Sequence, residues 1–316
     1  MNADVKSFYC KASSVGHIRS FVVKPIQELH MMHTYNNLNR KPCWARLRLG
    51  TSRKHYNETK VILGTSKARS ICQDACCPNM YLCFKSKSAA FIVMGASCTR
   101  SCTFCSVLKE RLLFLNPLEP FYIIRVLRSI HLNHVVMTSV NRDDLSDGGV
   151  EQFIRSVVEL KRNYPKLSTE LLVPDFKSNL KSVCNGFKGK LPNILNHNIE
   201  TVPRLYANVK LGTEYLNSAL LLGQFKRFNQ HSNSKTGIIL GFGEAAGEAL
   251  ITVCDLRNCG ITYLTLGQLL KSSHHKPTPN KHLHPNLFKI YKKIALQIGI
   301  PVVASEVMVR SSLKLS

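Results

Sequence analysis

Seven short runs of nearly continuous apolar residues recur along the chain, and longer segments with mixed polar and apolar positions separate them. The runs cover residues 89–95, 134–140, 169–174, 193–198, 236–243, 261–269 and 301–309. Strands that are apolar on both faces are typical of parallel sheets that helices cover on the outside. The pattern therefore predicts seven buried strands.

The segments between the runs predict amphipathic helices. In 149–163 one helical face carries Val150, Phe153, Ile154, Val157 and Val158. Pro285 suits the first turn of a second helix, and Gly299 suits its C-terminal end. Regular strand–helix alternation predicts an α/β protein, either a parallel barrel or a doubly wound sheet. In such barrels the chemistry lies in the loops that follow the carboxyl ends of the strands.

Composition narrows the class of protein. No apolar run approaches the roughly 18 residues that a membrane helix needs, so we expect no membrane span. The 43 Lys and Arg against 19 Asp and Glu give a net charge of +24, which attracts polyanions or an acidic protein. The basic residues are scattered and no nucleic-acid motif accompanies them, so no nucleic-acid partner is expected.

The first thirty residues are basic and poor in acid, but they lack the apolar core of a secretory signal. They are compatible with an unstructured N-terminus or a weak organellar transit peptide. Six of the 12 cysteines fall in two tight groups, which favours metal binding in a reducing compartment. We expect the bacterial cytoplasm first and the mitochondrion second.

The first cysteine group is Cys98, Cys102 and Cys105, with the spacing C-x-x-x-C-x-x-C directly after a predicted strand. Three thiolates can bind three irons of a four-iron cluster and leave the fourth iron open. The amino and carboxylate groups of S-adenosylmethionine can chelate an open iron, and a low-potential cluster can then cleave the sulfonium bond to an adenosyl radical. A structural zinc site is the alternative, but it usually takes four ligands.

The second group is Cys72, Cys77 and Cys83, with Cys76 as an additional neighbour. Taken alone, this spacing leaves a zinc site or a disulfide cluster open. Beside the first group it favours a second iron–sulfur cluster, because a radical made at one cluster needs a sulfur donor if carbon–sulfur bonds are to form.

These motifs resemble lipoyl synthases of the radical S-adenosylmethionine superfamily. The resemblance runs from about Arg40 to Leu313 and rests on ACCPNMYLCF, VMGASCTRSCTFCSV, TSVNRDDLSDGG, LVPDF, NHNIETVPRLY, TGIILGFGE and VRSS. It implies an α/β fold, a partial (β/α)6 TIM-type barrel in 89–300, after a Cys-bearing, irregular extension in 1–88. The last strand and a short C-terminal R-S-S tail would occupy 301–316.

The resemblance also implies two [4Fe–4S] clusters. Cys98, Cys102 and Cys105 would hold the radical-generating cluster. Cys72, Cys77 and Cys83 would hold an auxiliary, sulfur-donating cluster. A serine oxygen, placed at Ser312 with Ser311 as the near alternative, would complete the auxiliary site, and a hard oxygen donor binds iron more labilely than a thiolate does.

The activity implied is that of a sulfurtransferase, which inserts two sulfur atoms at carbons six and eight of a protein-bound octanoyl group. Implied partners are the octanoylated lipoyl domains of 2-oxo acid dehydrogenases, the glycine-cleavage H protein and a low-potential electron donor. Residues expected to contact the cofactors are Phe104, Gly148, Gly149, Asn198 and Glu200. Positions expected less strongly at the same loops are Arg142, Asp143, Asp144, Asn196 and His197.

Two other interpretations remain at this point. A zinc-binding nucleic-acid protein would also combine clustered cysteines with a high positive charge. Another sulfur-inserting enzyme of the same superfamily, similar to biotin synthase, would share the first cysteine group, but the C-x4-C-x5-C leader and the R-S-S end argue against it.

Overall fold

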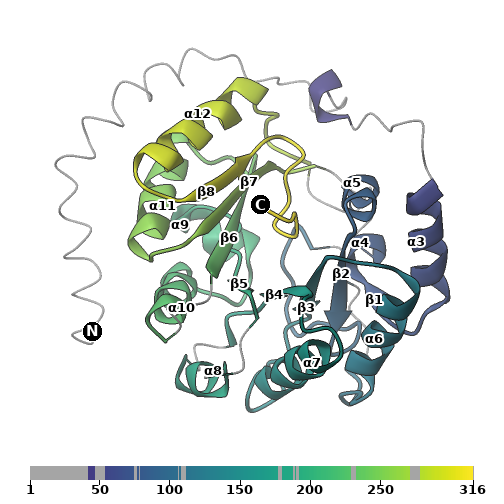
Figure 1. Ribbon diagram of the computed structural model, residues 1–316. Coiled ribbons are helices and arrows are strands. Elements are labelled where there is room, and N and C mark those ends of the chain that lie inside the picture. Colours follow the sequence, from purple (N-terminus) through teal and green to yellow (C-terminus); the bar gives the residue numbers. More distant parts are fainter. Residues whose placement is uncertain are drawn as a thin grey trace.

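The computed structural model describes residues 42–46, 54–74, 77, 79–105, 107, 112–176, 180–187, 189, 192–228, 233–270 and 278–315. Their strands form one eight-stranded sheet in the order of the sequence, and the sheet does not close on itself (Figure 1). The strands are β1 (Arg69–Ser70), β2 (Ser88–Val93), β3 (His134–Ser139), β4 (Ser168–Leu172), β5 (Ile194–Asn196), β6 (Asn233–Leu240), β7 (Tyr263–Gln268) and β8 (Val302–Ser305). Only β1 runs antiparallel to its neighbour, and β2 to β8 are parallel.

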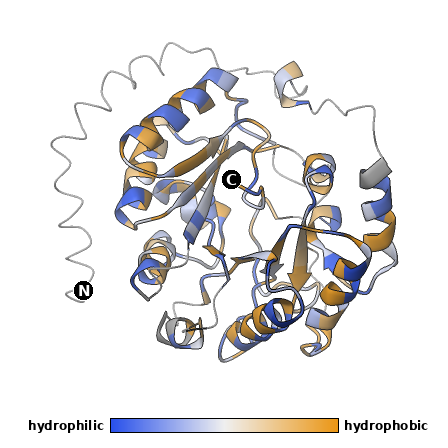
Figure 2. Cartoon of the chain, viewed as in Figure 1, coloured by the Kyte–Doolittle hydropathy of each residue, from blue (hydrophilic) through white to orange (hydrophobic). Residues whose placement is uncertain are grey.

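Helices follow the parallel strands and cover the outside of the curved sheet (Figure 1). They are α6 (Glu119–Ser129), α7 (Val150–Asn163), α8 (Leu180–Phe187), α9 (Pro203–Val209), α10 (Tyr215–Phe228), α11 (Ala246–Asn258) and α12 (Pro285–Gln297). Their apolar faces turn toward the strands and their polar faces turn outward (Figure 2). Two apolar clusters result, one around β2 to β4 and one around β6 to β8. In the described part of the chain, no helix has the length and apolarity to cross a membrane.

The predicted parallel strands and the two predicted helices are confirmed, with shifted ends. Pro285 stands in the first turn of α12, and Gly299 has φ of +97° just beyond its last turn, as a left-handed helix end requires. The largest difference is in 301–309, where β8 ends at Ser305. Beyond it the chain turns inward, with the amide of Glu306 bonded to the carbonyl of Leu266 at 3.2 Å, and enters the open side of the sheet.

The expectation of an irregular extension is wrong for the part between residues 54 and 88. It forms α3 (Lys54–Thr65), α4 (Ile71–Asp74) and α5 (Met80–Lys85), and β1 extends the sheet beside β2. Ring contacts from Tyr56 to Tyr81 and Phe84, at 5.8 and 6.0 Å between centroids, hold α3 against α5. A short 3-10 turn, η2 (Cys43–Ala45), precedes them, and residues 1–41 and Cys76 lie outside the described residues.

Candidate functional site

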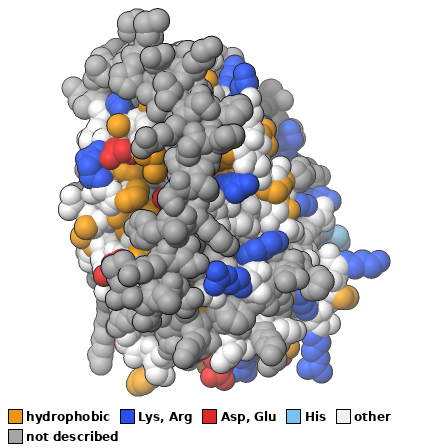
Figure 3. Space-filling view, turned by 90° about the vertical axis from the view of Figure 1, so that its left-hand side faces the viewer, with side chains coloured by type: hydrophobic (Ala, Val, Ile, Leu, Met, Phe, Trp, Pro, Cys, Tyr) orange, Lys and Arg blue, Asp and Glu red, His pale blue; other side chains and the backbone are white. Residues whose placement is uncertain are grey.

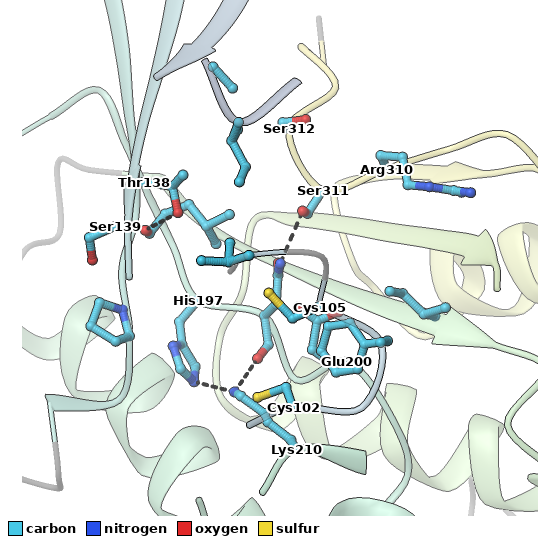
Figure 4. A pocket seen from close by; sticks show the side chains of 18 of the residues that line it. Cys102, Cys105, Thr138, Ser139, His197, Glu200, Lys210, Arg310, Ser311 and Ser312 are labelled. Atoms are coloured by element: carbon cyan, nitrogen blue, oxygen red, sulfur yellow. Dashed lines mark hydrogen bonds between the residues drawn. The ribbon is translucent and has the colours of Figure 1, made fainter. Parts of the chain in front are cut away.

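A pocket of about 360 Å³ lies on the inner side of the sheet, a size typical of small-molecule sites (Figure 4). Three parts of the chain that are distant in sequence meet there. They are the second cysteine group, the loop after β2 and the C-terminal tail, represented by Cys72, Cys77, Cys102, Phe104, Cys105, Arg310, Ser311 and Ser312. The fold therefore brings part of the predicted cofactor site to one cavity, whereas Cys83 and Cys98 are not among the residues that line it.

The first cysteine group lies on the loop that follows β2. Burial, followed by the neighbouring Cys105, raises the pKa of Cys102 to about 11, and Cys98 adds to this shift. The sulfur of Cys98 accepts the backbone amides of Arg100 at 3.4 Å and Asn141 at 3.3 Å. Two backbone amides therefore already donate to Cys98, and Cys102 interacts electrostatically with both other cysteines of the group.

Arg100 connects this loop, through ion pairs, to the segments that follow β3 and β4. Its guanidinium bonds both carboxylate oxygens of Asp143, each at 2.7 Å, and Asp175 at 2.8 Å. Burial disfavours the charged form of Arg100, but the hydrogen bonds to the two carboxylates outweigh it and raise the pKa of the guanidinium. Thr99 adds a bond to Asp143 at 2.9 Å. A buried ion triad thereby fixes the position of the loop.

The second cysteine group is brought together by α4 and α5. Cys72 lies in α4 and Cys83 in α5, and the amide of Cys77 bonds the carbonyl of Cys72 at 3.0 Å. Burial, then the neighbouring cysteines, raise the pKa of Cys72 to about 11 and that of Cys83 to about 12. Burial likewise raises the pKa of Cys77. Three thiols that act on one another electrostatically form a compact donor set.

The C-terminal tail closes the pocket from the open side of the sheet. Asn79, just before α5, donates to the carbonyl of Met308. The Ser311 hydroxyl accepts a hydrogen bond from Asn198 at 3.0 Å, as Figure 4 shows. Ser312 also lines the pocket, and in the described part of the chain its hydroxyl has no hydrogen-bond partner. Ser311 therefore uses its hydroxyl oxygen in a hydrogen bond to a described residue, and Ser312 does not.

Glycines on the inner face make room for this tail. A Cβ at Gly267 would collide with the carbonyl oxygen of Val309, and one at Gly237 would lie 3.2 Å from the Cβ of Ser311. We expect Gly267→Ala to lower the free energy of unfolding by about 1–3 kcal/mol, because backbone would have to move. Urea titration measures this. Gly64→Ala is the control, since its added Cβ meets only Gln73 at 4.0 Å, and an equal loss in both variants would contradict the argument.

The loop after β5 supplies a polar wall to the pocket. His197 is fully buried and bonds the carbonyl of Val173 at 2.8 Å and the hydroxyl of Ser218 at 2.9 Å. Burial and the nearby ammonium of Lys210 lower the pKa of His197 well below its usual value, so it is neutral at pH 7. These bonds give His197 a supporting role in the wall.

Lys210 completes this wall and was not expected from the sequence. Its ammonium donates to the carbonyl of Asn198 at 2.7 Å and contacts His197 at 3.2 Å (Figure 4). Burial raises the pKa of Glu200, and Lys210 opposes this shift. Lys210 also opposes the upward shift of the Cys102 pKa. A cation and a carboxylate therefore flank the first cysteine group.

The structure places the other predicted residues as follows. Phe104 lines the pocket and packs edge-to-face on Phe242, with ring centroids 5.9 Å apart. Gly148 and Gly149 stand at the start of α7, outside the pocket lining, where both have positive φ. Their contact with a cofactor stays a prediction. Earlier in the same loop, Arg142 pairs with Asp144 at 2.7 Å.

Asn196 lies deeper, among charged side chains that no motif indicated. It donates to Glu170 at 2.7 Å, and Glu170 pairs with Lys235 at 2.9 Å, all three being fully buried. The signal that could have found this group is a charge inside an otherwise apolar run, since charged residues are rarely fully buried unless they are paired.

The donor types at the site suit iron–sulfur clusters, whose usual ligands are thiolates. Among the described residues, no group of three or more His, Cys, Asp or Glu side chains is arranged to hold one metal ion. A zinc site gathers its ligands around one centre. In a four-iron cluster each thiolate takes a different iron, so the ligands stand farther apart. Two sets of three thiols, of which one has an added hydroxyl, match iron–sulfur ligation.

Comparison with known proteins finds lipoyl synthases among the relatives of this chain. A lipoyl synthase of Photobacterium profundum is 39% identical over 273 residues, which cover 86% of this chain and 85% of the relative. That of Ruthia magnifica is 40% identical over 273 residues, covering 86% of each. That of an Azoarcus species is 39% identical over 275 residues, covering 86% and 87%. No protein-family model matches the chain.

Solved structures share the fold at low sequence identity. Streptococcus suis SuiB bound to S-adenosylmethionine superposes with a TM-score of 0.52 at 13% identity, over 72% of this chain and 54% of SuiB. HydG, a maturase of the [FeFe]-hydrogenase, gives a TM-score of 0.51 at 9% identity, over 78% and 68% of the two chains. The predicted partial-barrel fold is confirmed by these likenesses.

Proposed function

The chain belongs to the lipoyl synthase family, and from this premise we propose that its two cysteine groups hold two [4Fe–4S] clusters with separate tasks. As a lipoyl synthase, it is a radical S-adenosylmethionine enzyme that inserts two sulfur atoms into a protein-bound octanoyl group. The observation that carries the proposal is that Cys72 and Cys77 line the same pocket as Cys102 and Cys105. A substrate chain in this cavity would lie between the two groups.

Cys98, Cys102 and Cys105 are proposed to hold the cluster that makes the radical. When bound, that cluster supplies the electron that cleaves S-adenosylmethionine. Asn198, Glu200 and the loop glycines are proposed to bind S-adenosylmethionine. The carboxylate of Glu200 suits its amino group and the ammonium of Lys210 suits its carboxylate, since opposite charges attract most in a pocket of low dielectric.

Cys72, Cys77, Cys83 and Ser312 are proposed to hold the auxiliary, sulfur-donating cluster. Among the described residues, the Ser312 hydroxyl in the pocket lining has no hydrogen-bond partner whereas that of Ser311 has one, which supports the choice of Ser312. Arg310, beside these residues, acts electrostatically on Cys77 and opposes the upward shift of the Cys77 pKa. Positive charge at this point would stabilise thiolate ligands.

The octanoyl chain needs an apolar path between the two groups. Aliphatic side chains from several strands line the pocket and would exclude water from it: Ile71, Ile92, Val136, Leu172, Ile239 and Leu269. These groups carry no acid or base, and such a wall fits a reaction at unactivated carbon. We place the acyl chain along this wall.

The protein partners are proposed from charge. On the face shown in Figure 3, Lys and Arg side chains outnumber Asp and Glu side chains, in keeping with the net charge of +24. An acidic carrier would be attracted to such a surface. We propose octanoylated lipoyl domains of 2-oxo acid dehydrogenases and the glycine-cleavage H protein as carriers, with a low-potential electron donor.

Anaerobic purification with iron and sulfide analysis tests the cluster assignment. We expect about eight irons per chain, as two four-iron clusters require. Zinc without iron would overturn the proposal in favour of a zinc protein. Mass spectrometry of an octanoylated carrier should show the gain of two sulfur atoms. Cys77→Ala should abolish this gain while cleavage of S-adenosylmethionine continues, because the first cysteine group is untouched.

A further inference from the structure

Two side chains of opposite charge, Glu170 on β4 and Lys235 on β6, face each other inside the sheet at 2.9 Å. Both side chains are completely shielded from solvent. A fully buried ion pair contributes little net stability, because the cost of removing two charges from water offsets their attraction. Its presence in the interior therefore calls for a role besides holding the sheet together.

Hydrogen bonds connect the ion pair and its neighbour Asn196 to the C-terminal tail. The ammonium of Lys235 donates to the carbonyl of Leu313 at 2.8 Å, the residue directly after Ser312. Asn196 bonds Glu170 at 2.7 Å and reaches the carbonyl of Ser311 at 3.4 Å. The group thus holds the backbone on both sides of Ser312 and makes no bond to the Ser312 hydroxyl.

We propose that Glu170 and Lys235 form a buried latch, which holds residues 311–313 in the position that presents Ser312 to the second cysteine group. Lys235 is then a positioning residue for the sulfur-donating site. The inference rests on the proposed function for the identity of that site. Glu170 on β4 bonds both Asn196 on β5 and Lys235 on β6, and these two side chains make the contacts with the tail.

The test needs a variant that loses the latch and still folds. Lys235→Met alone would leave the buried Glu170 carboxylate without its ammonium partner, which is destabilising. The double variant Glu170→Gln, Lys235→Met removes both charges, and Gln can still accept the bond from Asn196. The matched control is Arg204→Met, Glu248→Gln, which removes an ion pair of 2.7 Å at the exposed junction of α9 and α11.

Hydrogen exchange of the iron-free full chain measures the tail directly. We expect the amides of 307–315 to exchange roughly tenfold faster or more in the latch variant, since a released segment opens locally. In the control variant, the amides of 307–315 should exchange at the same rates as in the parent chain. Thermal unfolding establishes that both variants are folded under these conditions. Unchanged exchange in the folded latch variant would overturn the proposal.

Mössbauer spectra of the second cysteine group provide the second readout. The parent chain for these spectra carries the three substitutions Cys98→Ala, Cys102→Ala and Cys105→Ala together. Only the auxiliary site can then bind iron. In the latch variant, the signal of the iron with an oxygen ligand should disappear, and the spectrum should equal that of Ser312→Ala. If the ion pair is merely structural, this signal should remain. If the parent binds no cluster, or Ser312→Ala changes nothing, the proposed function fails instead, and hydrogen exchange alone decides on the latch.

Discussion

Replacing Arg100 with alanine is expected to empty the first cysteine group of iron and to lower the free energy of unfolding by about 3–5 kcal/mol. Arg100 is the cation between Asp143 and Asp175, and its side chain is 4% exposed. Without it, two carboxylates in the wall lose their counter-charge. The loop of Cys98, Cys102 and Cys105 loses its ion pairs to the segments that follow β3 and β4.

Iron analysis and urea titration measure the two effects. Iron should fall from about eight to about four per chain, because the second cysteine group lies on other elements. Arg100→Lys keeps the charge but not the forked geometry that bonds two carboxylates, so an intermediate iron content is expected. The exposed Arg204 provides the control, since Arg204→Ala removes only a surface ion pair and should leave the iron content and the urea midpoint close to those of the parent chain. Full iron content in Arg100→Ala would show that other contacts hold the loop.

The cysteine groups could be found from the sequence because each is local. The spacing of Cys98, Cys102 and Cys105 places three thiols on one loop whatever the rest of the chain does. The strands could be found because β2 to β7 are buried on both faces, so that their apolar runs are continuous. The short helices α4 and α5 were missed because four and six residues are too few to show a helical period.

The parts that could not be predicted depend on contacts across the fold. Lys235 meets Leu313 over 78 positions of sequence, and Asn198 meets Ser311 over 113. The periodicity of apolar residues along the sequence cannot predict such a contact. Lys210 is a single cation near the end of α9, and only the fold shows that it faces the pocket. The sequence pattern thus located the donors, while the fold decided which of them share a cavity.

Ser312→Ala is expected to reduce sulfur insertion by about 100-fold or more, the upper range for loss of groups that hold a metal in place. Cleavage of S-adenosylmethionine should continue, because Cys98, Cys102 and Cys105 remain. Ser311→Ala should be far milder. It removes one hydrogen bond to Asn198, worth about 1 kcal/mol, which corresponds to a loss of roughly fivefold. Mass spectrometry of the carrier, with cleavage of S-adenosylmethionine measured in parallel, separates the two variants.

A third variant distinguishes a ligand from a residue that only shapes the tail. Ser312→Cys replaces a hard oxygen with a soft thiolate, which binds iron more firmly. It should restore the iron that Ser312→Ala loses and still insert sulfur more slowly than the unmodified chain, because the donor must release its sulfide. A purely structural serine would give the same iron content in all three proteins. Loss of insertion in Ser311→Ala alone would make Ser311 the ligand and require its bond to Asn198 to break as iron enters.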